Sequence, residues 1–271
     1  MTARGRRRRW GSRATAGILL VAVSVVGAAC GSSASSSTTT TSARLSGSIT
    51  VSAASSLTGA FGQLASTFHA IHPGTTTAFN FGSSGALATQ IQQGAPADVF
   101  ASASPDDMAS VERAGDISGK PVIFARNQLE IVVKPGNPLG IHSLADLTKA
   151  PVVALCVNTA PCGATAQQAL AKVDVTLPST KVTLGQDVDA TLAEVTTGDA
   201  EAGIVYVTNA KTVGSQGQGV PIPAAQNVST SYPIAVVKTT TDPTLARAWM
   251  AYVLGPTGQS VLRRASFLPA H

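Results

Sequence analysis

The sequence predicts an α/β fold in two lobes, and three observations support this prediction. Short apolar, β-branched segments alternate with segments whose apolar residues recur every three or four positions, the helical period. Aromatic residues make up only 4% of the 271 residues, and Ala, Val, Gly and Thr are frequent, as in a core of small side chains. Two strand–turn–helix units also follow one another directly, which implies a parallel sheet whose turns meet at the carboxyl edge.

The first 29 residues are expected to be an export signal and not part of either lobe. Six arginines between Arg4 and Arg13 precede an apolar run from Ala14 to Ala29. A charged start followed by such a run is typical of a signal peptide. The run is short for a membrane span and ends in small residues, which favours cleavage over anchoring by the helix itself.

The residues around Cys30 predict a lipid anchor. Gly27-Ala28-Ala29-Cys30 resembles a bacterial lipobox, in which the cysteine is lipidated and becomes the new N-terminus, although Gly27 stands where Leu is usual. Residues 31–43 form a Ser/Thr tract with nothing to bury, as expected of a flexible tether. We therefore expect residues 30–46 to tie the folded part to the outer face of the cell membrane.

The net charge of +5 comes from the leader. Removing its six arginines leaves 13 Lys and Arg against 14 Asp and Glu, a net charge near −1. Such a balance gives no reason to expect a nucleic-acid partner.

The stretch from Ile49 to Phe68 is the clearest strand–turn–helix unit. Its strand leads into small residues that include Ser55 and Ser56, and its helix carries apolar residues at helical spacing. Hydroxyls and free amides at a helix start outline an anion site. For this turn taken alone, a simple helix cap remains the alternative.

The same alternation continues to the C-terminus. We predict strands at 76–81, 99–102, 128–133, 152–157, 181–184, 202–206 and 231–237. We predict helices after the turn at 82–85, at 105–114, 143–147 and 161–172, and starting at 187, 243 and 256. The break after Val133 and the returning strand at 231–237 divide the chain into lobe 1 (47–127 and 234–271) and lobe 2 (128–233), joined by two crossovers.

Catalytic signatures are weak in this sequence. No G-x-S-x-G turn, Walker A sequence or G-x-G-x-x-G fingerprint occurs, and no histidine stands in a motif with a serine. His69 and His72 could share a metal, but the Pro-Gly that follows them favours a solvated helix end. The small, hydroxyl-bearing turns therefore indicate a binding site, and we expect no enzyme activity, cofactor or bare metal cation. A serine hydrolase using Ser56 or Ser84 is the rival from another class.

Six segments together carry a family resemblance. ITVSAASSLTGAF, FGSSGALATQI, GAPADVFASA, Pro161-Cys162-Gly163, Asp187-Val188 and GIVYVTNA occur in this order over 49–268. They resemble the molybdate-binding proteins of bacterial ABC transporters. The resemblance implies a type II periplasmic-binding-protein fold, in which two α/β lobes clamp an oxyanion in the cleft between them.

The resemblance also implies ligand contacts, which are carried over position by position. They are hydroxyls or main-chain N–H groups, namely those of Ser56, Ser84, Cys162, Val188 and Tyr206. Gly85 replaces a serine that is common in the family. From the pattern alone, Val188 and Tyr206 would be read as core residues.

The implied function is an extracytoplasmic, lipid-anchored solute-binding protein for molybdate, and for tungstate as well. It is expected to act as a monomer and to deliver its ligand to an ABC transporter permease in the membrane. Within the class, the alternative ligand is sulfate or another tetrahedral oxyanion.

Two further expectations concern residues near the turns. Cys156 and Cys162 lie six residues apart in an exported chain, which favours a disulfide over two free thiols. Asp98, in GAPADVF, would repel an oxyanion and is expected to be a structural cap or hinge group.

Overall fold

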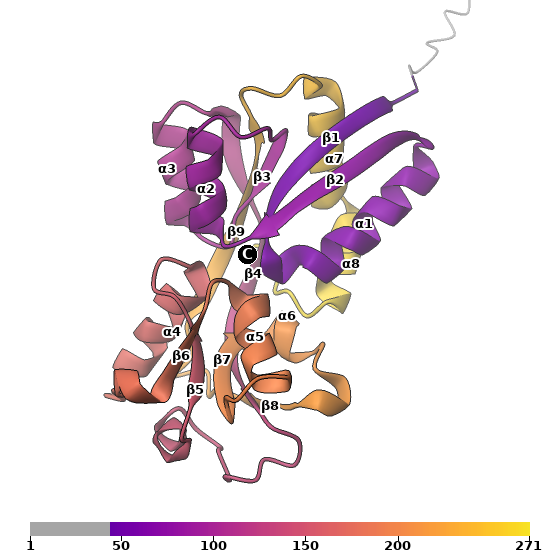
Figure 1. The fold of residues 1–271 in the computed structure, drawn as a ribbon. Helices are drawn as coiled ribbons and strands as arrows, with labels where there is room; N and C mark the ends of the chain where they lie inside the picture. Colours follow the sequence, from indigo (N-terminus) through magenta and orange to yellow (C-terminus); the bar gives the residue numbers. More distant parts are fainter. Residues whose placement is uncertain (1–43) are drawn as a thin grey trace, which may run out of the picture. The chain divides into compact units, whose positions relative to one another are not determined.

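The computed structural model describes residues 44–271, so the predictions for the signal peptide, for Cys30 and for most of the tether lie outside the described residues. These residues form two α/β lobes, each built on its own part of a sheet (Figure 1). The two-lobed α/β fold that the sequence predicts is confirmed.

Lobe 1 contains the first strands of the chain. β1 (Ser46–Ala54) lies between β2 (Gly74–Gly82) and β3 (Val99–Ala101), and both pairings are parallel. The carboxyl ends of β1 and β2 therefore lie side by side, and the chain turns into a helix after each. The helices of this lobe are α1 (Thr58–Ile71), α2 (Ser84–Gln92), α3 (Pro105–Arg113), α7 (Pro243–Leu254) and α8 (Pro256–Arg264).

Lobe 2 repeats the arrangement with shorter strands. β5 (Val153–Cys156) pairs in parallel with β6 (Val182–Gly185) and with β7 (Ala202–Tyr206). The edge strand β8 (Gln218–Pro221) runs antiparallel to the crossover strand. Its helices are α4 (Pro161–Ala171), α5 (Val188–Thr196) and the short α6 (Val207–Ala210).

Two long antiparallel strands connect the lobes. β4 (Ile117–Val133) pairs with β9 (Ser229–Val237) over Ile117–Gln128 and then with β7 and β8 in lobe 2. β9 also pairs with β3 in lobe 1. The helix starts of both lobes face each other beside these strands (Figure 1).

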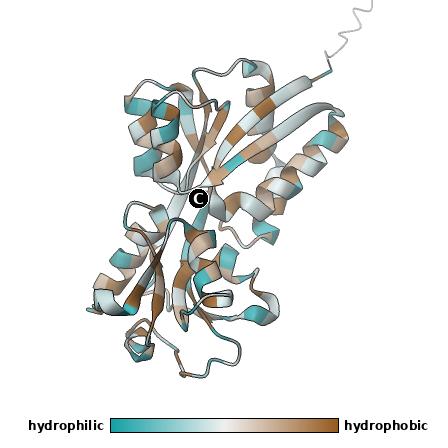
Figure 2. Cartoon of the chain, viewed as in Figure 1, coloured by the Kyte–Doolittle hydropathy of each residue, from teal (hydrophilic) through white to brown (hydrophobic). Residues whose placement is uncertain are grey.

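The two lobes have separate cores of different composition. In lobe 1 the Trp249 ring lies 5.9 Å from Phe61 and 5.5 Å from Phe68, both edge-on. In lobe 2 the buried residues are almost all aliphatic. Hydrophobic residues are concentrated on the central strands, and the outer faces of helices such as α2 and α3 are more hydrophilic (Figure 2).

Most predicted elements occur close to their expected positions. The strand at 202–206 matches β7, and Asp242 caps α7 by accepting a hydrogen bond from the N–H of Leu245. The short helix expected at 143–147 is a 3-10 turn at Ala145–Lys149. The strand expected at 128–133 is only the end of β4, because the register shifts around Ser118–Val122 and Ile123–Ala125 hide its first half from pattern reading.

Candidate functional site

One pocket between the lobes is lined by all five residues that the resemblance singled out. Lobe 1 contributes Ser56 and Ser84, and lobe 2 contributes Cys162, Val188 and Tyr206. The pocket also contains Ala54, Ser55, Gly82, Ser83, Ala103, Ala160, Pro161 and Asp187. The space between these residues is small, about 200 Å³ with open solvent included, so it suits a small ion.

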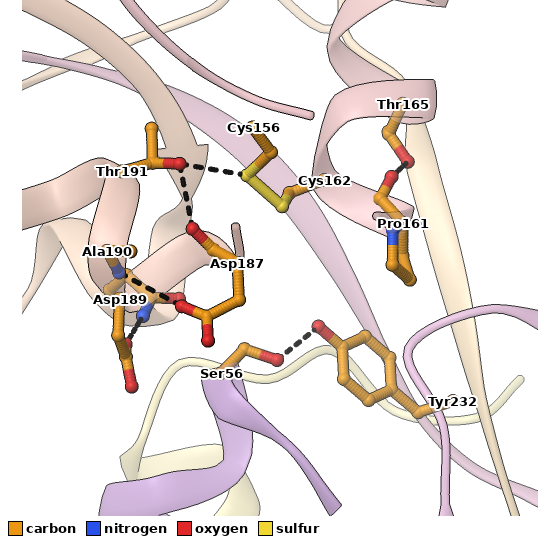
Figure 3. The surroundings of a disulfide bond; sticks show 11 residues. Ser56, Cys156, Pro161, Cys162, Thr165, Asp187, Asp189, Ala190, Thr191 and Tyr232 are labelled. Carbon is orange, nitrogen blue, oxygen red and sulfur yellow. Dashed lines mark hydrogen bonds between the residues drawn. A yellow bond between two sulfur atoms is a disulfide. The ribbon is translucent and has the colours of Figure 1, made fainter. Parts of the chain in front are cut away.

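Ser56 lies in the 3-10 turn η1 (Ser55–Leu57), which leads directly into α1. The Ser56 side chain is almost fully buried, and its Oγ lies 2.8 Å from the hydroxyl of Tyr232 on β9 (Figure 3). The N-cap residue Ala54 has no side chain that could bond the first amides of the turn. These N–H groups therefore remain available to a ligand.

Ser84 opens α2 and is fully buried. Its Oγ accepts a hydrogen bond of 2.9 Å from the N–H of Ala103, so the hydroxyl proton of Ser84 is free to point elsewhere. The preceding N-cap residue, Ser83, makes no side-chain cap bond. Both serines thus present O–H donors next to unused helix amides.

Lobe 2 presents main-chain donors at two helix starts. α4 begins at Pro161, which has no N–H, and its N-cap Ala160 cannot cap with its side chain. The next N–H, that of Cys162, therefore needs a partner from outside the helix. α5 begins at Val188 after Asp187, whose carboxylate accepts a bond of 2.9 Å from the N–H of Ala190.

A disulfide holds these two helix starts in place. Cys156, the last residue of β5, is bonded to Cys162 in α4, with 5.8 Å between their Cα atoms (Figure 3). The hydroxyl of Thr191 in α5 has one proton, which is shared between the carbonyl of Asp187 at 2.8 Å and the sulfur of Cys156 at 3.2 Å. The expected disulfide is therefore present, and it links the strand end to both helices that face the pocket.

Tyr206 supplies an unpaired donor. Its ring is buried, and its hydroxyl has no hydrogen-bond partner among residues 44–271. Burial and then the neighbouring Tyr232 raise the pKa of Tyr206 well above the usual value, although the nearby Thr165 hydroxyl lowers it, so the phenol keeps its proton. Within the same residues, the other buried polar side-chain atom without a partner is the indole N–H of Trp249, which lies in the lobe 1 core. A buried donor without a partner is costly, and because Tyr206 lines the pocket its hydroxyl is available to a bound anion.

The pocket offers hydrogen-bond donors but no basic side chain among the described residues. No Lys or Arg is among its described lining residues, so attraction to an anion comes from N–H and O–H dipoles and from helix starts. Two carboxyl groups stand near it. Burial raises the pKa of Asp107 in α3 to about 6. Partial desolvation of its carboxylate and the nearby Asp187 raise the pKa of Asp189 in α5 to about 6.

The lobes touch each other on both sides of the pocket. A Cβ added at Gly85 in α2 would lie 2.7 Å from the carbonyl oxygen of Thr159 in lobe 2, so a side chain there would collide with the opposite main chain. On the other side, Thr58 donates a hydrogen bond of 3.3 Å to Asp189. Gly85, the position where the family often has serine, is thus a point of close contact between the lobes.

Asp98 and His69 make hydrogen bonds within lobe 1. Asp98 accepts hydrogen bonds from the N–H of Thr50 and from the hydroxyl of Thr240, which makes it a structural link within lobe 1, as predicted. His69 is bonded through Nδ1 to the carbonyl of Thr75. In the described part of the chain, no group of three or more His, Cys, Asp or Glu side chains could hold a metal ion.

Comparisons with known proteins agree with this geometry. Residues 49–268 match the family described as bacterial extracellular solute-binding protein. The chain belongs to this family. Among curated relatives, it is 41% identical to the molybdate-binding protein ModA of Mycobacterium tuberculosis over 221 residues, which cover 81% of this chain and 84% of that protein. It is 32% identical to ModA of Escherichia coli over 233 residues, covering 82% and 89%.

Solved structures share the fold of this solute-binding protein. The periplasmic molybdate-binding protein of Azotobacter vinelandii superposes with a TM-score of 0.72 at 21% identity, covering 81% of this chain and 98% of that one. The sulfate-binding protein SubI of Mycobacterium tuberculosis gives 0.75 at 22% identity, covering 82% and 86%. Since these two structures are described as binding different anions, the fold alone does not choose the ligand. Among the helices of residues 44–271, none combines the length and hydropathy that a membrane span needs.

Sequence reasoning missed several residues of the site of this solute-binding protein. Tyr232 contacts Ser56 but does not stand out by spacing or composition, and Asp187, which the sequence marks only as a helix start, lines the pocket. Asn127, which donates a hydrogen bond to Tyr232, sits in the part of β4 that was not predicted. Only the three-dimensional pairing of β4 with β9 brings these side chains to Ser56.

Proposed function

We propose that this protein captures molybdate, and tungstate as well, outside the cytoplasm and delivers it to the permease of an ABC transporter. The observation that carries the proposal is the buried, unpartnered hydroxyl of Tyr206, which faces a small pocket of further donors. The two ModA relatives, both named molybdate-binding, support the choice of anion.

The proposed contacts come from both lobes. Hydroxyl groups of Ser56, Ser84 and Tyr206 and main-chain N–H groups of Cys162 and Val188 bind the oxygens of one anion. Each bond to a charged oxygen contributes about 1.5–3 kcal/mol, because the donors are already in place. Binding from both sides holds the lobes together around the ligand.

Donor chemistry also predicts the order of affinities. Molybdate, tungstate and sulfate are bare dianions near pH 7, whereas phosphate, with a second pKa of roughly 6 to 7, carries a proton. The five proposed contacts are donors, and the carboxylate of the lining residue Asp187 already accepts a hydrogen bond from Ala190, so that O–H is left without a partner among them, at a cost of about 1–3 kcal/mol. Sulfate matches the donors by charge but is smaller, so it leaves some of them too far away.

Calorimetric titration with the four anions tests the proposal. We expect molybdate and tungstate to bind most tightly, sulfate much more weakly and phosphate most weakly. Thermal unfolding should follow the same order, because a ligand that binds only the folded state raises the melting temperature. If sulfate or phosphate binds as tightly as molybdate, the proposed ligand is wrong. A phosphate signal that disappears in Asp187→Asn would identify Asp187 as the acceptor of the phosphate proton.

We also propose that the mature protein is a monomer, and that a lipid on Cys30 holds it at the outer face of the cell membrane. The cysteine follows a signal-like leader and precedes a Ser/Thr tract. Cys30→Ala should release the protein from the membrane fraction into the medium or periplasm, with molybdate binding unchanged. A variant that stays with the membranes would refute the lipid anchor without affecting the proposed ligand.

A further inference from the structure

A buried chain of hydrogen bonds runs from the crossover strands to Ser56. Asn127 on β4 and Tyr232 on β9 are both fully buried. The Nδ2 of Asn127 lies 3.3 Å from the Tyr232 hydroxyl, which in turn lies 2.8 Å from Ser56 Oγ. Neither Asn127 nor Tyr232 lines the pocket itself, so any effect on the ligand passes through Ser56.

The direction of this chain is fixed at Asn127. Its Oδ1 accepts the N–H of Gln128 at 3.0 Å, so the amide NH₂ faces the other way. The amide NH₂ of Asn127 donates one hydrogen bond to Thr208 Oγ1 at 2.9 Å and a second to the Tyr232 oxygen. Thr208 in turn donates its own proton to Asn209. An amide nitrogen only donates, so the Tyr232 oxygen accepts.

The Tyr232 proton then has one place to go. The polar side-chain contacts of Tyr232 within residues 44–271 are Asn127, which donates to it, and Ser56. Burial raises the pKa of Tyr232, so the phenol stays protonated and donates to Ser56 Oγ. With its oxygen occupied in this way, the Ser56 hydroxyl directs its own proton into the pocket.

We propose that Tyr232 and Asn127 are positioning residues that hold Ser56 as a donor, and that this makes the site discriminate against oxyanions that carry a proton. A serine hydroxyl without such a partner rotates and can accept a hydrogen bond as readily as it donates one. Fixing its direction removes one acceptor that a protonated anion could use at the lobe 1 side of the pocket, whereas the Asp187 carboxylate lies on the lobe 2 side. Successive donors in one direction also polarise each other, which strengthens the last bond. This inference rests on the proposed function and deepens it.

Tyr232→Phe tests the inference, and another tyrosine of the protein provides a matched control. The variant keeps the buried ring and removes only the hydroxyl. Tyr252→Phe removes a similar bond, because the Tyr252 hydroxyl donates to Thr67 at 2.8 Å on the far side of lobe 1. Molybdate affinity is measured by calorimetry with and without excess inorganic phosphate, and thermal unfolding without ligand verifies that each variant is folded.

For Tyr232→Phe we expect molybdate to bind about threefold to tenfold more weakly, the loss of one modest hydrogen bond. Phosphate should compete more strongly than with the wild type, because Ser56 becomes free to accept its proton. Tyr252→Phe should change neither quantity. Phosphate competition that stays at the wild-type level, or molybdate and phosphate affinities that fall by the same factor, would overturn the inference.

A double-mutant cycle with Ser56→Ala separates positioning from a general structural effect. If Tyr232 acts through Ser56, the double variant Ser56→Ala/Tyr232→Phe should bind molybdate with the same affinity as Ser56→Ala alone. The same loss in both backgrounds would show that Tyr232 does not act through Ser56. A wild-type protein that binds none of the four anions would instead refute the proposed function, so the two failures are distinguishable.

Discussion

The two lobes offer donors of different kinds to the same pocket. Lobe 1 offers the side chains of Ser56 and Ser84, whose oxygens are held by hydrogen bonds with the Tyr232 hydroxyl and with the N–H of Ala103, respectively. Lobe 2 offers mainly main-chain N–H groups at the starts of α4 and α5, with Tyr206 as its one side-chain donor. Side-chain identity should therefore matter in lobe 1 and matter little at Val188, whereas at Cys162 it matters for the disulfide and not for the ligand contact.

The two lobes also differ in the contacts that hold their donors in place. Lobe 1 packs its helices on an aromatic cluster around Trp249, so its serines are positioned by a rigid core. Residues 128–228 contain a single aromatic residue, Tyr206, and lobe 2 relies on the Cys156–Cys162 disulfide next to its helix starts. A lobe with small aliphatic side chains thus fixes its main-chain donors by a covalent link.

This difference between the lobes predicts unequal losses of affinity when one pocket side chain is truncated in each lobe. Ser84→Ala removes a donor to the ligand and leaves the N–H of Ala103 without its acceptor, so we expect molybdate affinity to fall about a hundredfold or more. Val188→Ala keeps its N–H and should stay within about threefold of the wild type. Calorimetry measures both, and equal losses would show that the lobes do not differ in this way.

Tyr206→Phe tests the exception in lobe 2. The variant keeps the buried ring and loses one donor to a charged oxygen, at about 1.5–3 kcal/mol, or about tenfold or more in affinity. In the absence of ligand it should be at least as stable as the wild type, because the hydroxyl has no partner among the described residues. An unchanged dissociation constant for molybdate would show that Tyr206 is a core residue that does not bind the ligand.

Gly85→Ala tests how closely the lobes must approach. The added Cβ would lie 2.7 Å from the Thr159 carbonyl in the opposite lobe, and overpacking of this kind costs about 1–3 kcal/mol. We expect affinity to fall about tenfold, with no loss of stability in the absence of ligand, because alanine favours the helix. Gly62→Ala in α1, where a Cβ meets nothing within 4 Å, is the control. Equal affinities for the two variants would mean that binding does not need this contact.

Most of the fold and the five pocket positions could be predicted because they leave local signals. Strand–turn–helix periodicity is visible in any short window, and the family resemblance marks the turns themselves. Asn127 and Tyr232 leave no such signal, because their role depends on the pairing of two strands about a hundred residues apart. Gly85 was noticed only as a missing serine, and its contact with Thr159 depends on how the lobes meet.

The smallest expected effect concerns the carboxyl groups where the lobes meet. Burial raises the pKa of Asp107 from 3.8 to about 6, so the folded state binds its proton more tightly than the unfolded chain does. The charged carboxylate therefore destabilises the fold, fully above about pH 6, and this cost disappears as the pH falls below about 4. The shift corresponds to at most about 3 kcal/mol, and solvent screening of this partly exposed group reduces it to about 1 kcal/mol.

Asp107→Asn should therefore raise the melting temperature by about 2–4 °C at pH 7 and by much less at pH 4.5, where the wild-type carboxyl is mostly protonated. Asp106→Asn is the matched control, because Asp106 is an exposed neighbour in the same first turn of α3 and shares its helix-dipole interaction. Because the Asp106 charge is one cause of the raised pKa of Asp107, Asp106→Asn should show the same pH dependence with a smaller gain at pH 7 than Asp107→Asn. If the rise in melting temperature for Asp107→Asn is as large at pH 4.5 as at pH 7, burial does not destabilise the charged carboxylate of Asp107. Lobe 1 would then meet lobe 2 without an electrostatic cost at this position, and closure of the pocket would be governed by the contact at Gly85 and by the donors themselves.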